Sequence, residues 1–144
     1  TVKTDDIFMK NDPAEGIPGI RLETTSAKGT TERRFLHTVV VGAAGDALPP
    51  SEAVAGEGAE GARIDNEVYV FAQSAPQSAP QRIAYLAPSG PTAHFVVGLA
   101  PGGKYAVSAA QQGALCKVTV APGGTSTASA NGVLALSAQA CTVK

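Results

Sequence analysis

Residues 92–110 read TAHFVVGLAPGGKYAVSAA, and this stretch decides the fold. Two short apolar runs, 92–99 and 104–110, are separated by Pro-Gly-Gly at 101–103. Gly and Pro at such a break are typical of a turn between short strands and not of a continuing helix. The stretch therefore predicts two neighbouring β-strands.

The same pattern recurs along most of the chain, at intervals of about ten residues. Further short apolar runs bounded by Gly, Pro or Ser occupy 20–24, 33–42, 62–73, 81–87, 114–121, 126–130 and 132–138. No stretch has a convincing helical period of 3.6 residues. The sequence predicts an all-β fold, an antiparallel β-sandwich of about 8–10 short strands that is immunoglobulin-like, fibronectin-like or jelly-roll-like.

One of these runs predicts a hairpin in more detail. In residues 62–73, Asp65 and Asn66 suit the turn, because both residue types tolerate turn conformations. After the turn, Val68 and Val70 fall on one face of the strand, and Tyr69 and Phe71 fall on the other.

The domain prediction has three parts. Residues 1–19 are polar and charged and are expected to form an extended lead-in. Residues 20–144 are expected to form a single β-sandwich domain. Within it, the Gly-, Ala-, Pro- and Glu-rich stretch at about 43–61 is expected to be a long surface loop.

Charge and hydropathy exclude two classes of partner. All 12 acidic residues lie between Asp5 and Glu67, and residues 68–144 carry only four scattered cations. Four spread cations do not form a nucleic-acid patch, so no nucleic-acid partner is expected. No apolar stretch approaches the roughly 20 residues of a membrane-spanning helix, so no membrane span is expected.

The two cysteines, Cys116 and Cys141, lie close to the end of the sequence. No further Cys or His sits nearby at zinc-ligand spacing, and the chain has no twelve-residue EF-hand calcium loop. The sequence predicts no metal and no cofactor. A disulfide between neighbouring strands suits an exported protein, and two buried free thiols are the alternative.

A short signature surrounds Tyr105. The segment Leu99-Ala-Pro101-Gly-Gly-Lys-Tyr105-Ala-Val107 resembles the L-x-P-x-x-x-Y-x-V pattern of fibronectin type III and related sandwiches. This resemblance implies that the Tyr105 hydroxyl bonds to the backbone upstream and closes a corner between the sheets. Tyr105 is therefore expected to be structural.

A second resemblance covers roughly residues 20–138. The segments that carry it are Arg21-Leu-Glu23, Phe35-Leu-His37, Val68-Tyr-Val-Phe71, His94-Phe-Val-Val-Gly98 followed by Leu99 to Val107, and Gly132-Val-Leu134. In order and spacing they resemble the C-terminal β-sandwich of heparinase II/III-like polysaccharide lyases. The resemblance implies a parent enzyme of that kind, in which Tyr and His from a helical toroid and its partner sheet carry out catalysis. No toroid is present here, so the resemblance implies an accessory domain to which no catalytic residue carries over.

The residues themselves offer no catalytic constellation either. His37 and His94 each lie inside a strand pattern and are interpreted as ordinary strand residues. No Ser occupies a G-x-S-x-G elbow, and no phosphate-binding glycine loop is present. The chain alone is not expected to be an enzyme.

Two functions fit these observations. The first is a carbohydrate-binding accessory domain of a secreted or periplasmic bacterial polysaccharide-degrading protein, whose glycan the lyase resemblance suggests contains uronic acids. Its partners would be an acidic polysaccharide and a catalytic domain of the same parent chain. Candidate ligand-binding residues are Arg33, Arg34, Arg63, Arg82 and Lys104 for anionic groups, with Tyr69 and Tyr85 for stacking.

The second function is a fibronectin- or immunoglobulin-like structural spacer, or a domain-bracing module, without a ligand. A face that presents Tyr and Arg together would favour binding. A face of Ala, Ser and Thr alone would favour the spacer, and a sizeable exposed apolar patch would favour a structural role.

Overall fold

The computed structural model describes the backbone of residues 2–8 and 18–24, and all atoms of residues 43, 45–73 and 82–144. The chain divides into two compact units, Thr1–His37 and Thr38–Lys144. The first unit holds β1 (Val2–Phe8) and β2 (Pro18–Thr24), which pair antiparallel as a hairpin.

This hairpin differs from the predicted lead-in at residues 1–19. β1 lies within that stretch, and β2 pairs with β1 and with none of the larger unit's described strands. The unit boundary accordingly falls after His37 and not at residue 20. The polar composition of residues 1–16 hid the strand, whose pairing with β2 is local. The predicted strand at 33–42 lies outside the described residues.

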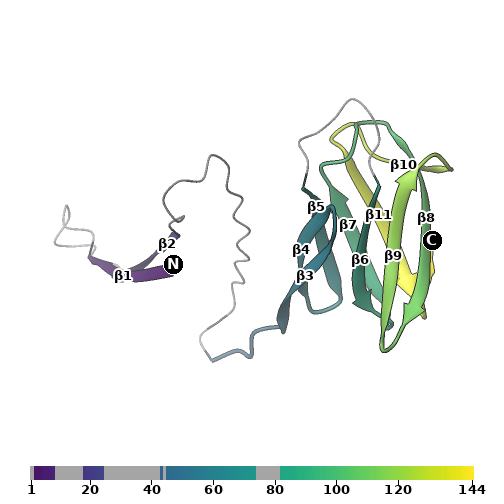
Figure 1. The fold of residues 1–144 in the computed structure, drawn as a ribbon. Coiled ribbons are helices and arrows are strands. Elements are labelled where there is room, and N and C mark those ends of the chain that lie inside the picture. The colour runs from purple at the N-terminus through teal and green to yellow at the C-terminus, as the bar shows by residue number, and fades with distance from the viewer. Residues whose placement is uncertain (1, 9–17, 25–42, 44, 74–81) are drawn as a thin grey trace. The chain divides into compact units, whose positions relative to one another are not determined.

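In the described part of the larger unit, ten strands form one mixed sheet in the order β10-β8-β9-β6-β3-β4-β5-β7-β11-β12. Figure 1 shows how this sheet curls. In chain order the strands are β3 (Ser51–Glu57), β4 (Ala59–Ile64), β5 (Glu67–Ala72), β6 (Ile83–Pro88), β7 (Thr92–Val97), β8 (Lys104–Gln112), β9 (Leu115–Pro122), β10 (Ser126–Thr127), β11 (Val133–Gln139) and β12 (Thr142–Val143).

The predicted all-β fold class is confirmed. The sheet curls around the core so that β12, at one end of the strand order, packs against β8, near the other end. Each neighbouring pair is antiparallel except β5 and β7, which run parallel. No helix in the described part of the chain is long and apolar enough to cross a membrane.

The predicted hairpin at 62–73 is also present. β4 and β5 pair up to Ile64 and Glu67, which leaves Asp65 and Asn66 as a two-residue connection. Asp65 has a φ of 52°, in the left-handed region that Asp adopts more readily than most residues.

The predicted loop at 43–61 is wrong over its second half, because β3 and the start of β4 occupy residues 51–61. β3 buries only Val54, so its small residues lack the alternation that marks a strand in sequence. Pairing with β4 and β6 holds it in place. A Cβ at Gly56 would collide with the Ala84 carbonyl oxygen, so glycine permits the close approach of β3 to β6.

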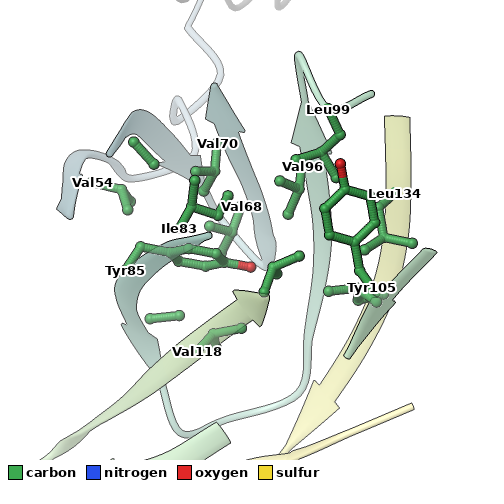
Figure 2. Packing of buried hydrophobic residues seen from close by; sticks show 14 of the residues in the cluster. Val54, Val68, Val70, Ile83, Tyr85, Val96, Leu99, Tyr105, Val118 and Leu134 are labelled. Atoms are coloured by element: carbon green, nitrogen blue, oxygen red, sulfur yellow. The ribbon is translucent and has the colours of Figure 1, made fainter. Parts of the chain in front are cut away.

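The core lies inside the curled sheet (Figure 2) and consists mainly of small and medium side chains. Its members are Val54, Ala59, Val68, Val70, Ile83, Tyr85, Ala87, Val96, Leu99, Tyr105, Val118, Val120, Ala128, Leu134 and Leu136. The two tyrosines are the largest side chains among the fully buried residues. These two rings fill core volume that Val and Ala side chains alone would leave empty.

Tyr105 closes a corner in the way its sequence motif implies. Its buried hydroxyl accepts a hydrogen bond from the backbone amide of Ala100, at 3.1 Å. Ala100 is itself buried, so no water replaces this acceptor if the hydroxyl is removed.

We expect Tyr105→Phe to lower the free energy of unfolding by about 1–3 kcal/mol, because the Ala100 amide is left buried without an acceptor. Urea unfolding followed by fluorescence or circular dichroism measures the loss. Tyr69→Phe is the matched control, since the Tyr69 hydroxyl bonds to exposed Glu67. Equal losses in the two variants would contradict this role of Tyr105.

Cys116 and Cys141 form a disulfide with a Cα–Cα distance of 5.3 Å. Cys116 lies on β9 with 2% of its surface exposed, and Cys141 lies in the turn between β11 and β12. The bridge therefore ties the β11–β12 hairpin to the opposite half of the curled sheet. Of the two alternatives left by the sequence, the structure has the disulfide.

Candidate functional site

The outward face of β5, β7 and β11 is organised in cross-strand rows. Val68 and Val70 on β5, and Val96 on β7, point into the core. Because side chains alternate along a strand, their neighbours Tyr69 and Phe95 point outward. Sequence alternation alone places these residues outward, but the strand pairing is what sets them side by side.

The central row carries two stacked aromatic rings. Tyr69 lies opposite Phe95 in the parallel pair, and their ring centroids are 5.2 Å apart at an interplanar angle of 16°. Ala62 on β4 and Ala135 on β11 flank the pair on its two sides. Since alanine is small, the outer surfaces of the two rings are not covered by a large cross-strand neighbour.

The next row toward the start of β5 opens into a groove, which we call the end groove, with a volume of about 780 Å³. Its lining residues are Asn66, Glu67, Pro91, Thr92, Ala93, Ser137, Ala138, Gln139, Ala140, Thr142 and Lys144. This volume falls in the range of small-molecule and cofactor sites.

Glu67 connects the end groove to the aromatic pair. Its carboxylate accepts a hydrogen bond from the Tyr69 hydroxyl, two residues along the same face of β5. This hydrogen bond, with some desolvation and the carboxylate charge, raises the pKa of Tyr69 above its usual value. Glu67 therefore links the groove to the aromatic pair.

The end groove has a mainly apolar lining that carries several polar groups, and its charges nearly balance. Asn66 and Gln139 contribute amides, which donate and accept, and Ser137 and Thr142 contribute hydroxyls. Glu67 and Lys144 are the charged side chains in its lining and have opposite sign. Such a set of donors and acceptors suits a ligand that carries many hydroxyl groups.

Beneath the groove lies a buried polar cluster. His94 is completely buried; the Tyr85 hydroxyl lies 3.0 Å from its Nδ1, and Thr92 Oγ1 lies 2.7 Å from its Nε2. Burial lowers the pKa of His94 to about 4, so the ring is neutral near pH 7. With both nitrogens occupied inside the core, His94 is placed as a structural residue, as the sequence analysis expected.

Tyr85 corrects one prediction. It was expected as a stacking platform, but only 1% of its surface is exposed. It lies on the core face of β6 opposite Val118, and its hydroxyl is used by His94. Burial also raises its pKa. Tyr85 cannot contact a ligand in this fold.

The predicted cations do not gather into one site. Arg63 is half-buried beside β5 and pairs with Glu52 at 3.7 Å, and Lys104 is exposed at the start of β8. Arg63 lies opposite Val68, so it is on the other face of the sheet from Tyr69. Arg33 and Arg34 lie outside the described residues.

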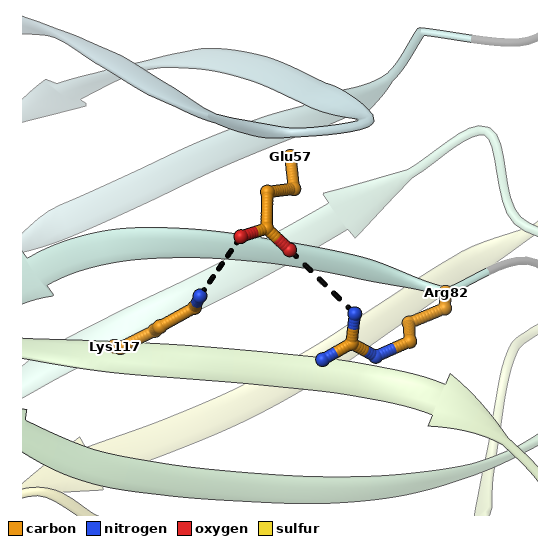
Figure 3. A network of polar contacts seen from close by, with 3 residues as sticks. All are labelled: Glu57, Arg82 and Lys117. Carbon is orange, nitrogen blue, oxygen red and sulfur yellow. Dashed lines mark hydrogen bonds and ion pairs between the residues drawn. The ribbon is translucent and has the colours of Figure 1, made fainter.

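Arg82 belongs to a separate surface network (Figure 3). Glu57 on β3 accepts a hydrogen bond from Lys117 Nζ at 2.9 Å and forms an ion pair with Arg82 at 3.5 Å. The hydrogen bond and charge of Lys117, with a smaller contribution from Arg82, lower the pKa of Glu57. The Glu57 carboxylate thus offsets part of the positive charge of Lys117 and Arg82. Its contact with Lys117 connects β3 to β9 across the intervening strand β6.

Of the predicted ligand-binding residues in the described part, only Tyr69 lies at the candidate site. Phe95 and the groove residues of β11 and β12 were missed. Phe95 was readable from alternation in residues 92–97. The adjacency of β7 to both β5 and β11 was not, since these pairings link distant segments.

No group of three or more His, Cys, Asp or Glu side chains that could hold a metal ion occurs among the described residues. The fold and the site define a class only, a β-sandwich-like domain with a surface groove and a neighbouring outward aromatic pair. Comparison with protein-family models, with curated proteins and with solved structures finds no match.

Proposed function

We propose that this chain is a non-catalytic carbohydrate-binding domain that holds a glycan in the end groove and against the Tyr69–Phe95 pair. The observation that carries the proposal is that Glu67 lines a groove containing amides and hydroxyls and also bonds to Tyr69 of the outward aromatic pair. Sugars are recognised by this combination, because their hydroxyls need donors and acceptors and their C–H faces pack on aromatic rings.

The charges of the site favour an uncharged glycan. Glu67 and Lys144 offset one another in the end groove, and Arg63 and Arg82 lie elsewhere. An acidic polysaccharide would need several cations on one surface to offset its charge. The proposal therefore departs from the uronic-acid expectation, which rested on the lyase resemblance alone.

The proposed setting is an accessory domain of an exported polysaccharide-degrading protein. The Cys116–Cys141 disulfide supports export, since such bonds persist mainly outside the reducing cytosol. The heparinase II/III-like resemblance supports a polysaccharide lyase as parent. Catalysis would then reside in another domain of that parent.

Affinity gel electrophoresis tests this function with neutral glucans, alginate, heparin and hyaluronan at low and moderate salt. We expect retardation by a neutral polymer that persists at moderate salt. Tyr69→Ala should weaken that binding about tenfold, or about 1.4 kcal/mol, because it removes one ring of the stacked pair. Gln139→Ala should also weaken it by removing a groove amide.

Two controls match these variants. Leu115→Ala removes an exposed apolar side chain from β9, and Gln112→Ala removes an exposed amide from β8; neither residue lines the groove. Neither should change the retardation. Migration unchanged in every neutral gel would contradict the proposal, as would retardation by acidic polymers that moderate salt abolishes.

A second candidate function, the bracing of a neighbouring domain, is favoured by the row beyond the aromatic pair. There Phe71, 39% exposed, lies opposite Val97, and Val97 lies opposite Val133. Arg63 and Arg82 do not join Tyr69 on this face, so these residues do not give the combination of Tyr and Arg that would favour binding. If Phe71→Glu destabilises the intact parent protein far more than Leu115→Glu does, while no glycan retards the chain, bracing is the function.

A further inference from the structure

The hydrogen-bonding directions of β8 follow from its pairing with β9. Lys104 lies opposite Gly123, and the Gly123 amide donates to the Lys104 carbonyl at 2.9 Å. Hydrogen-bonded and non-hydrogen-bonded pairs alternate along an antiparallel ladder. The backbone groups of Ala106, Ser108 and Ala110 therefore point to β9.

The backbone groups of Tyr105, Val107, Ala109 and Gln111 consequently point away from β9. β10 has only two residues and pairs with β8 at Lys104 and Tyr105. The amides and carbonyls of Val107, Ala109 and Gln111 form no ladder with another strand in the described part of the chain. β12 packs against β8, but its ladder is formed with β11 alone.

β12 packs against β8, but the sequence of this edge carries none of the usual protection against pairing. Natural edge strands carry charges, proline, bulges or covering segments that block a second strand. Residues 106–112 read AVSAAQQ, without charge or proline. Their register with β9 is continuous and contains no bulge.

We propose that the free edge of β8 pairs with β8 of a second copy of the chain, so that two curled sheets join across a two-fold axis. A two-fold axis makes the paired strands antiparallel, and outward-pointing residues must lie opposite one another. Centring the axis on Ala109 sets Val107 opposite the partner's Gln111 and uses all three outward residues of each strand. Each of the three pairs then exchanges two hydrogen bonds.

The side chains suit this pairing of like strands. Lys104 is the only charged residue of β8 and lies at the end away from the axis, beyond the paired residues. Cross-strand neighbours near the axis are Ala, Ser, Val and Gln, so no like charges oppose one another. The carbohydrate groove lies on other strands, so the two proposals stand independently.

Hydrogen exchange of the unmodified chain at low and high protein concentration tests the pairing directly. We expect exchange at Val107, Ala109 and Gln111 to slow about tenfold when about nine chains in ten are paired. The alternating amides of Ala106, Ser108 and Ala110 are an internal control, because β9 already protects them at every concentration. Sedimentation should show a monomer–dimer equilibrium over the same range.

Gln111→Pro removes one outward amide without removing a bond to β9 and should shift the equilibrium to monomer. Ala135→Pro is its matched control. The mutual bonds of Ser137 and Lys144 show that odd-numbered residues of β11 point away from β7. Ala135 therefore also has an amide outside the β7 ladder, but on a different edge, and its variant should dimerise normally.

Three results would overturn the proposal. They are a chain that stays monomeric at high micromolar concentration, a dimer in which the β8 amides exchange as in the monomer, and equal dimerisation of Gln111→Pro and Ala135→Pro. If Gln111→Pro fails to fold, the exchange of the unmodified chain decides alone.

Discussion

Cys116→Ala combined with Cys141→Ala is expected to lower the free energy of unfolding by about 3.5 kcal/mol. The bond joins residues separated by 25 positions, so its loss restores the freedom of a loop of that size to the unfolded chain. For such a loop, the chain-entropy relation gives about 3.5 kcal/mol at 25 °C. The site tolerates alanine because Cys116 is packed among apolar core residues.

Urea unfolding of the oxidised chain, the reduced chain and the double variant measures this loss. The reduced chain and the double variant should unfold at similar urea concentrations, well below the oxidised chain. Reductant should leave the double variant unchanged, which controls for effects of the reductant itself. A loss below about 1 kcal/mol would contradict a dominant role for the closed loop.

His94 should make the protein less stable as the pH falls from 6.5 toward 4. Its pKa is lowered from 6.5 to about 4 by burial in the folded chain. Above pH 6.5 the ring is neutral in both states, so the full stability is present. Between 6.5 and about 4 the unfolded chain binds a proton that the folded chain does not bind, and this favours unfolding.

The expected loss across this window is about 3 kcal/mol, from about 1.4 kcal/mol for each unit of pKa difference. Chemical denaturation at about pH 7.5, 6, 5 and 4 measures this loss of stability, because these values span the range between the two pKa values of His94. His94→Gln keeps a polar side chain and lacks the titration, so its stability should change less over the same range. Parallel pH profiles of the two proteins would contradict the assignment to His94.

Alternation within short segments predicted much of the fold. Residues 62–73 predicted the β4–β5 hairpin, its turn at Asp65-Asn66 and the placement of Tyr69 on the face opposite Val68, because all three depend on neighbours in sequence. β3 was missed because Ala and Gly carry little alternation and the strand depends on pairing with β4 and β6.

Alternation within short segments predicted less of the candidate site than of the fold. Tyr85 alternates with Ala84 and Leu86, so the sequence did not decide which face of β6 is buried; the β9 neighbour Val118 decides it. The end groove needs β5, β7 and β11 side by side, and two long-range pairings create that arrangement. A sequence period reveals a strand's faces but not its distant neighbours.

The parallel pair β5–β7 also has a consequence for how the chain folds. No tight turn can join two parallel strands, and here β6 intervenes and pairs with β3 and β9. The β3–β4–β5 and β8–β9 segments can form from nearby residues, but the pairings of β7 with β5 and β11 cannot. Folding therefore has to close long loops before these contacts contribute, which places the unit among slowly folding, high-contact-order proteins.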